Sequence, residues 1–187
     1  MELSNKTVLF LGSSVTYGSA SGGISFADFM AEECNLTMVK EALSGTTLAD
    51  VDDSSYVARL KRVDKKIKPH LVIVQLSTND SGRKIPLPQT EEAIRWIVSY
   101  VEDTWRCPVA FYTGTYFDRP AYAETVERLF ALADECGFYV IDLWNDPELL
   151  AVSKSDYARY MADPVHPTLY GYKDWWTPKF IEFCRNL

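Results

Sequence analysis

A histidine and an aspartate lie three residues apart in the segment Asp163-Pro164-Val165-His166-Pro167-Thr168, near the C-terminus. Histidine is the usual general base near neutral pH, because its side chain ordinarily titrates at about 6.5. A carboxylate beside it can hold the reactive tautomer and stabilise the imidazolium that forms. The other histidine, His70, precedes an apolar run and is expected to be structural. We therefore predict His166 as a base and Asp163 as the residue that orients it.

A nucleophile for this base is found at the other end of the chain, in Gly12-Ser13-Ser14-Val15-Thr16-Tyr17-Gly18. The two glycines permit a tight turn directly after an apolar run. A serine there can act as a nucleophile when a base lies within hydrogen-bond distance. Taken alone, Ser14 is more often a turn residue or a helix N-cap. Together the two segments suggest a serine hydrolase assembled from opposite ends of the chain.

Two further residues could stabilise an oxyanion. Gly45 follows a second apolar run and can present its backbone N–H to an anion, although a plain turn glycine is the commoner case. Asn79 follows a third run, and loss of one such amide donor costs on the order of 3 kcal/mol of transition-state stabilisation. An Asx turn is the alternative for Asn79. Asp174 and Asp142 are poorer partners for the base, because they fall on a predicted helix and inside a predicted strand.

Five short apolar runs alternate with stretches of helical periodicity, which favours a parallel sheet with helices on both faces. The predicted strands are Thr7–Leu11, Leu36–Ala42, Leu71–Leu76, Val109–Thr113 and Phe138–Leu143. The predicted helices are Phe26–Glu33, Ser54–Lys66, Thr90–Trp105, Ala121–Cys136 and Leu169–Cys184, with a bend or restart at Pro178. Every polar candidate follows a strand's carboxyl end, the edge where open α/β sheets form ligand crevices.

Four short segments in this order resemble the sequence blocks of the SGNH hydrolases, also called GDSL esterases/lipases. They are Gly12–Gly18, Ser44-Gly45, Ser77-Thr78-Asn79-Asp80 and Asp163–Pro167. The resemblance implies a flavodoxin-like three-layer α/β/α sandwich with a five-stranded parallel sheet, formed by residues 1–187 as one domain. It also implies an acyl-serine mechanism that needs no metal or organic cofactor.

The resemblance assigns a role to each candidate. Ser14 would be the nucleophile, His166 the base and Asp163 its partner, while the Ser14 and Gly45 backbone N–H groups and the Asn79 amide would form the oxyanion hole. Two positions depart from the family pattern. Ser13 replaces an aspartate that supports the turn. Ser77 replaces a glycine, which would cost roughly 1–2 kcal/mol if that position needs a positive φ.

The substrate is predicted to be a small-molecule acyl ester. Short acyl groups are favoured, acetyl above all, with carbohydrates among the alcohols, in part because many family relatives deacetylate sugars. Tyr17, Tyr116 and Phe117 are expected to bind the substrate, although ordinary packing of aromatic residues explains them equally well. A lysophospholipase or thioesterase of the same family is the alternative. A non-catalytic binding module or a flavin- or nucleotide-binding protein also stays open, although no phosphate-binding glycine motif occurs.

Composition excludes several other classes. The net charge of −7 argues against partners such as nucleic acid or anionic membranes, since both attract basic surfaces. No run reaches the roughly 20 apolar residues of a membrane span. The four scattered cysteines contain no C-x-x-C pair, which gives zinc binding no support. Without a recognisable signal peptide, a cytoplasmic location is expected, and the sequence gives no oligomeric state.

Overall fold

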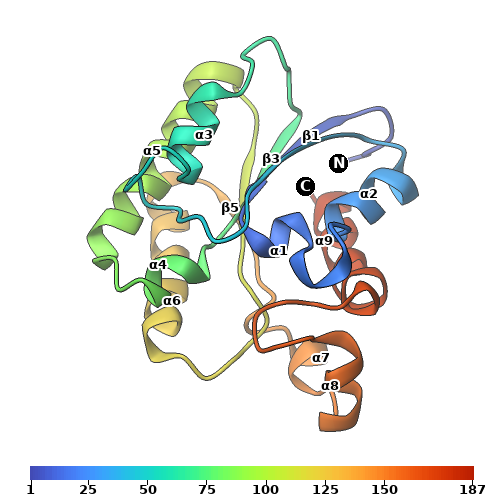
Figure 1. Cartoon of the computed structure of the whole chain (residues 1–187). Coiled ribbons are helices and arrows are strands. Elements are labelled where there is room, and N and C mark those ends of the chain that lie inside the picture. Colours follow the sequence, from blue (N-terminus) through green and yellow to red (C-terminus); the bar gives the residue numbers. More distant parts are fainter.

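The computed structural model describes residues 1–187, the whole sequence. Five parallel strands form one sheet in the order β2-β1-β3-β4-β5 (Figure 1). The strands are β1 Thr7–Gly12, β2 Thr37–Ala42, β3 Leu71–Gln75, β4 Val109–Tyr112 and β5 Tyr139–Ile141. This is the flavodoxin-like strand order. The predicted fold class is confirmed, and each predicted strand is present.

The central strands are buried on both faces, which explains their continuous apolar sequence. Every residue of β3 is buried, and so are Val8–Gly12 of β1. The edge strand β2 is only half-buried and carries Lys40 and Glu41. Leu9 of β1 pairs with Val39 on one side and Val72 on the other. The strand that ends in Gly12 is thereby held between two neighbours, and only Ser13 separates it from Ser14.

Helices cover both faces of the sheet (Figure 1). Leu9 and Leu11 of β1 point to one hydrophobic core, whereas Val8 and Phe10 point to the other, as alternation along a strand requires. The helices over the first core are α3 Tyr56–Arg62, α5 Leu87–Trp105 and α6 Pro120–Cys136. Those over the second are α2 Phe26–Cys34 and α9 Thr177–Arg185, with η2 Gly171–Trp176 before α9.

The helices differ from the prediction at two places. Helix α3 covers only Tyr56–Arg62 of the expected Ser54–Lys66, because Ser55 caps it and Val63 is already extended. The expected C-terminal helix consists of two parts, since the wide turns of η2 end at Trp176 and α9 begins at Thr177. Pro178 lies in the first turn of α9, where its missing N–H costs nothing. The backbone stays in the αR region at Trp176 and Thr177, so the hydrogen-bond pattern changes just before Pro178 while the helical path continues.

Short helices that the sequence analysis did not predict lie at the carboxyl edge of the sheet. Helix α1, Ser14–Tyr17, follows β1 without a loop, and η1, Ser19–Ser21, continues it. Helix α4, Thr78–Gly82, follows β3. Helices α7 Pro147–Leu150 and α8 Lys154–Tyr160 lead from β5 to the segment that carries His166. No helix has both the length and the apolar character needed to cross a membrane.

Candidate active site

Ser14 and His166 lie in contact although 152 positions separate them in the chain. The Oγ atom of Ser14 is 2.7 Å from Nε2 of His166. Ser14 is the first residue of α1, directly beyond the carboxyl end of β1. The N–H of a first helical residue has no acceptor within its helix and is available to a ligand. The Ser14 hydroxyl and the His166 imidazole therefore have the separation that proton transfer between a serine and a base needs.

Asp163 lies on the other side of the imidazole. Its Oδ2 is 2.7 Å from Nδ1 of His166, and its Oδ1 accepts the backbone N–H groups of Val165 and His166 at 2.7 and 2.8 Å. Burial by itself would raise the pKa of Asp163, but the hydrogen bonds from Val165 and His166 outweigh it and hold the pKa below its usual value. An ionised Asp163 accepts the Nδ1–H of a neutral imidazole, which leaves Nε2 free to accept the Ser14 proton.

The competing residues lie elsewhere. Asp142 accepts hydrogen bonds from the backbone and side chain of Asn145 at 3.0 and 2.9 Å, and Asp174 lies 3.8 Å from Arg159. His70 Nδ1 accepts the backbone N–H of Thr7 at the amino end of the sheet. None of the three contacts the pair formed by Ser14 and His166.

A buried glutamine that the sequence analysis did not single out holds the turn at Ser14. Oε1 of Gln75 accepts the backbone N–H groups of Ser13 and Thr16 at 2.9 and 3.2 Å, and the Thr16 hydroxyl at 2.9 Å. The Tyr112 hydroxyl lies 2.7 Å from that of Thr16 and extends the network to β4. A side chain at Gly12 would collide with Thr16, so the turn requires glycine there. The sequence did contain a signal for Gln75, because it is a polar residue at the end of an otherwise apolar strand.

Gly45 and Asn79 belong to two segments joined by a hydrogen bond. Nδ2 of Asn79 donates to the backbone carbonyl of Thr46 at 2.8 Å, next to Gly45. Gly45 has a φ of +79°, which favours glycine, and it is exposed at the edge of the sheet. The Asn79 amide keeps a second N–H for a ligand. Both predicted oxyanion donors thus lie at one edge, and the Asn79 side chain is bonded to the backbone next to Gly45.

The serine at position 77 causes no strain. Ser77 has a φ of −73°, so its replacement of the family's glycine does not carry the cost considered for a positive φ. Its hydroxyl accepts the backbone N–H of Asn79 at 3.1 Å and caps α4. Ser13, the other departure, has a φ of −115° and is fully buried, and its N–H is held by Gln75. Both serines are compatible with the local backbone.

Asp80 is a second buried residue that the sequence analysis did not single out. It holds the segment that follows Gly45. It is 2% exposed, and its two carboxylate oxygens accept the backbone N–H groups of Leu48 and Ala49 at 2.8 Å each. The Thr90 hydroxyl of α5 donates to it at 3.2 Å. A buried carboxylate with these three donors fixes residues 48–49, and through them the chain that follows Gly45.

A cleft of about 690 Å³ opens beside His166. Among its lining residues are Tyr116, Phe117, Arg119 and Tyr157. Tyr116 is half-exposed and packs on Trp144. The structure thus brings two of the three predicted aromatic residues to the cleft.

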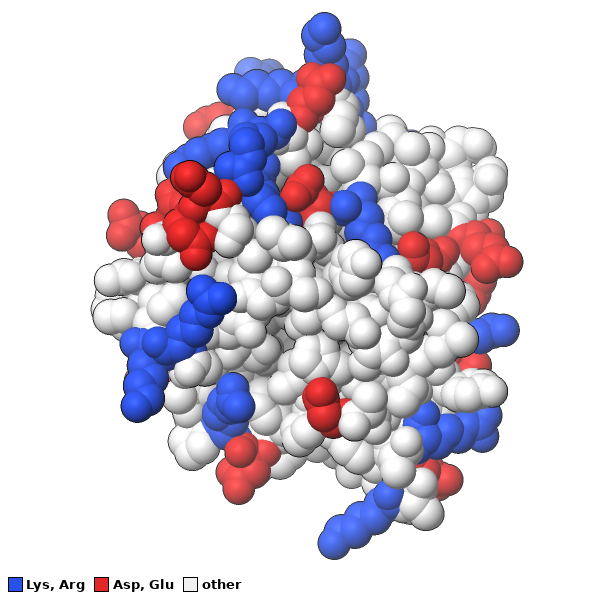
Figure 2. All heavy atoms as spheres, viewed as in Figure 1, with Lys and Arg blue, Asp and Glu red and all other residues white.

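The third aromatic residue, Tyr17, does not line this cleft. Its ring lies near Gly23, with Nζ of Lys40 5.9 Å from its centre. Figure 2 shows that charged side chains lie mostly around the margins of the face that carries α1 and α4, and that its centre is largely uncharged and hollowed. The centre of this face thus carries little charge around the hollow.

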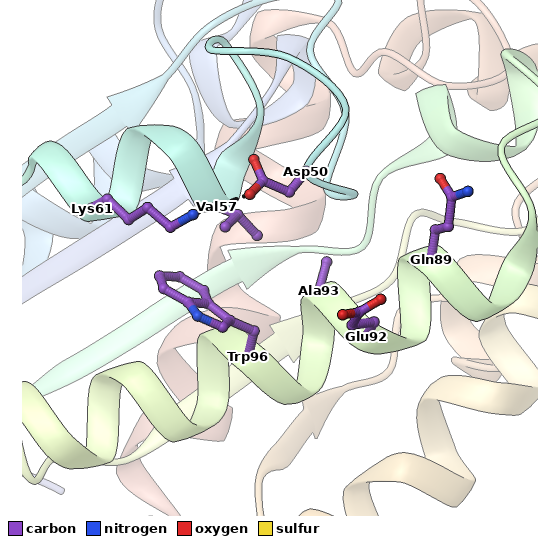
Figure 3. A pocket seen from close by; sticks show the side chains of 7 residues that line it. All are labelled: Asp50, Val57, Lys61, Gln89, Glu92, Ala93 and Trp96. Carbon is purple, nitrogen blue, oxygen red and sulfur yellow. Dashed lines mark hydrogen bonds and ion pairs between the residues drawn. The ribbon is translucent and has the colours of Figure 1, made fainter.

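A second groove, of about 400 Å³, lies between α3 and α5 (Figure 3). Asp50, Lys61 and Trp96 face one another across it, and Gln89 and Glu92 line its other end. Nζ of Lys61 is 3.1 Å from Asp50 and 4.9 Å from the centre of the Trp96 ring. The lysine thus already occupies the aromatic surface and neutralises the carboxylate. No predicted site residue lines this groove.

Solved structures with the same fold include esterases. A protein from Lactobacillus plantarum has a TM-score of 0.83 at 18% identity, with 98% of each chain covered. An acetylxylan esterase from Geobacillus stearothermophilus has a TM-score of 0.74 at 17% identity, with 97% of this chain and 95% of that one covered. A family two carbohydrate esterase from Clostridium thermocellum, in complex with cellohexaose, has a TM-score of 0.75 at 14% identity. The match covers 100% of this chain and 65% of that one. At these identities the likeness establishes the fold.

The family follows from the sequence itself. The comparison with curated proteins finds no match. Residues 10–173 match the model of the GDSL-like lipase/acylhydrolase family, a span that begins before Ser14 and ends after His166. Because this span covers most of the 187 residues and the fold agrees, the chain belongs to the GDSL-like lipase/acylhydrolase family of carboxylic ester hydrolases, as its four sequence blocks predicted.

Proposed function

We propose that this protein is a serine esterase that hydrolyses short-acyl esters, acetyl esters above all, with Ser14 as nucleophile. The observation that carries the proposal is the continuous contact from Ser14 Oγ to His166 Nε2 and from His166 Nδ1 to Asp163 Oδ2, at 2.7 Å for each step. Three side chains in this order form the arrangement that activates a serine at neutral pH.

The reaction has two steps. His166 takes the hydroxyl proton as Ser14 Oγ attacks the ester carbonyl, and the oxyanion accepts hydrogen bonds from the Ser14 and Gly45 N–H groups and from Asn79. The protonated His166 then gives its proton to the departing alcohol, and an acyl-serine remains. In the second step His166 activates a water molecule that releases the acid and restores Ser14.

Two observations support a short acyl group. A small inner cavity touches Val15 and Val165, the neighbours of the proposed nucleophile and base, and has a volume of only about 10 Å³. That is room for about one water-sized group. The much wider cleft beside His166 is exposed and lined by Tyr116, Phe117 and Tyr157, which suits a bulkier alcohol with a polar and an apolar side.

Carbohydrate is the proposed alcohol. Aromatic rings can pack against sugar rings, and Tyr116 presents a half-exposed ring at the cleft. The similar structures named as an acetylxylan esterase and a carbohydrate esterase give the same indication. A panel of acetylated xylo-oligosaccharides, lysophospholipids and acyl thioesters tests this choice. Hydrolysis of lysophospholipid together with no hydrolysis of any acetylated sugar would contradict it.

The first experiment compares hydrolysis of p-nitrophenyl acetate by the wild type and by Ser14→Ala, with the folding of both checked by circular dichroism. We expect turnover by the wild type only. A fluorophosphonate probe should label the wild type and leave Ser14→Ala unlabelled, because the probe reacts with activated serines. Equal activity of the two folded proteins would require another nucleophile. A folded wild type that neither turns over substrate nor reacts with the probe would favour a binding module.

A further inference from the structure

Arg59 is a buried arginine of α3, and two of the residues that accept its hydrogen bonds lie within two positions of Ser14 or Gly45. It is 4% exposed. A guanidinium has five N–H donors, and five donor–acceptor contacts are formed here. The acceptors are Ser54 O at 2.9 Å, Glu41 O at 2.8 Å, Glu41 Oε1 at 3.2 Å, Gly12 O at 2.6 Å and Thr46 Oγ1 at 3.2 Å.

Two of these acceptors belong to the segments that carry the proposed oxyanion donors. Gly12 is the last residue of β1, two positions before Ser14. Thr46 follows Gly45, and its carbonyl accepts the Asn79 amide. The same nitrogen of Arg59, Nη2, contacts both Gly12 and Thr46. The guanidinium therefore links the segment of Ser14 to the loop of Gly45, beside the backbone hydrogen bond from Leu43 N–H to Gly12 O at 3.2 Å.

We propose that Arg59 is a positioning residue of the oxyanion hole: its planar fork sets the spacing between the Ser14 N–H and the Gly45–Asn79 pair. The inference rests on the proposed function, because it assigns Arg59 a part in the same reaction. Arg59 itself touches no substrate. Its effect passes through Gly12 and Thr46 to the three donors that meet the developing negative charge.

The role proposed for Arg59 depends on the planar guanidinium group, which lysine lacks. Lysine carries the same charge on a single nitrogen and cannot reproduce five donors in fixed directions. Without the fork, Gly12 O keeps only the Leu43 N–H and the Thr46 hydroxyl keeps only the Leu43 carbonyl, so the two segments are held less tightly. A misplacement of about 1 Å at a reacting site can cost roughly 100-fold in rate.

The test measures kcat and KM for p-nitrophenyl acetate with Arg59→Lys and Arg59→Gln. We expect kcat to fall by about 10- to 100-fold, while KM stays within about twofold, since the donors act mainly in the transition state. The inhibition constant of a boronic acid, which forms a tetrahedral adduct with the serine, should rise by a similar factor. The pH dependence of kcat/KM should keep its wild-type midpoint, because Arg59 contacts neither Asp163 nor His166.

Arg62→Gln is the matched control. Arg62 belongs to the same helix, is exposed and donates to the Asp53 carbonyl, away from the site. It should keep the wild-type kcat. Folded Arg59 variants with wild-type kcat and unchanged boronate inhibition would overturn the inference, and so would a loss confined to KM.

A second variant covers the case in which replacement of Arg59 prevents folding. Thr46→Val keeps the shape and the backbone carbonyl that Asn79 uses, but it removes the hydroxyl that Arg59 contacts and that donates to Leu43 O at 2.7 Å. We expect a several-fold lower kcat with little change in KM, and a wild-type kcat would overturn the inference. Failure of the proposed function is distinguishable, because the wild type itself would then react with neither ester nor fluorophosphonate, and both proposals would fall.

Discussion

The two halves of the candidate site are built differently. The half with Asp163 and His166 is a short loop in which the Asp163 carboxylate accepts hydrogen bonds from residues two and three positions away. The half with Ser14, Gly45 and Asn79 is held by buried side chains that come from distant strands and helices. His166 is thus oriented by Asp163 three residues away, whereas the segments of Ser14, Gly45 and Asn79 are held by the packed core. The two halves should respond differently to mutation, to denaturant and to pH.

The largest effect is expected on the exposed half. Asp163→Asn removes the acceptor that selects the reactive tautomer of His166, and kcat should fall on the order of 1,000-fold. Circular dichroism and melting should change little, because Asp163 is exposed and its contacts are local. Steady-state kinetics at neutral pH measures the loss. Asp174→Asn is the matched control and should keep wild-type activity; a similar loss there would mean that Asp174 is the true partner.

On the buried half, Asn79→Ala should lower kcat by about 100-fold, the usual effect of losing one oxyanion donor. It should also lower the melting temperature, because the amide holds the Thr46 carbonyl. Kinetics and thermal melting of the same samples separate the two effects. Asn145→Ala removes an amide whose partner is Asp142, and it should leave kcat unchanged. Loss of activity without loss of stability would show that the two halves are less different than proposed.

Gln75→Leu should act mainly on stability. It leaves the buried N–H groups of Ser13 and Thr16 without an acceptor, and the free energy of unfolding should fall by about 2–3 kcal/mol. Urea denaturation monitored by tryptophan fluorescence measures the change. Gln89→Leu, on the outer wall of the groove between α3 and α5, is the control and should change stability by less than about 0.5 kcal/mol. Equal effects of the two variants would contradict the role given to Gln75.

The smallest effect concerns pH. The pKa of Asp163 is lowered in the folded protein, so its contribution to stability is present above the carboxyl pKa of the unfolded chain, about 3.9, and is lost as the pH falls through the folded value. Because the side chain is half-exposed, we expect less than about 1 kcal/mol. Urea denaturation of the wild type and Asp163→Asn at pH 7 and pH 3 measures it. The difference in the free energy of unfolding between the two proteins should shrink at pH 3. A larger difference at pH 3 would mean that the pKa of Asp163 is raised in the folded protein.

Local patterns predicted the part of the site that is local. Asp163 and His166 lie three residues apart, so their pairing follows from a short stiff loop with two prolines. Ser14, Gly45 and Asn79 could be placed at one edge, because parallel strands bring their carboxyl ends together. The sequence analysis did not identify Gln75, Arg59 or Asp80, since a single polar residue next to an apolar run or on a helix has no period that reveals its partner.

The sequence by itself determined the family, the five parallel strands and the identity of the candidate nucleophile and base, because apolar runs and short motifs are readable along one chain. Only the tertiary structure decided that Ser14 and His166 come within 2.7 Å, that Ser77 needs no positive φ and that Tyr17 lies away from the cleft. It also decided that Arg59 joins two segments of the site. These facts depend on which distant residues meet when the two cores close, and burial makes each unpaired donor costly enough to fix the arrangement.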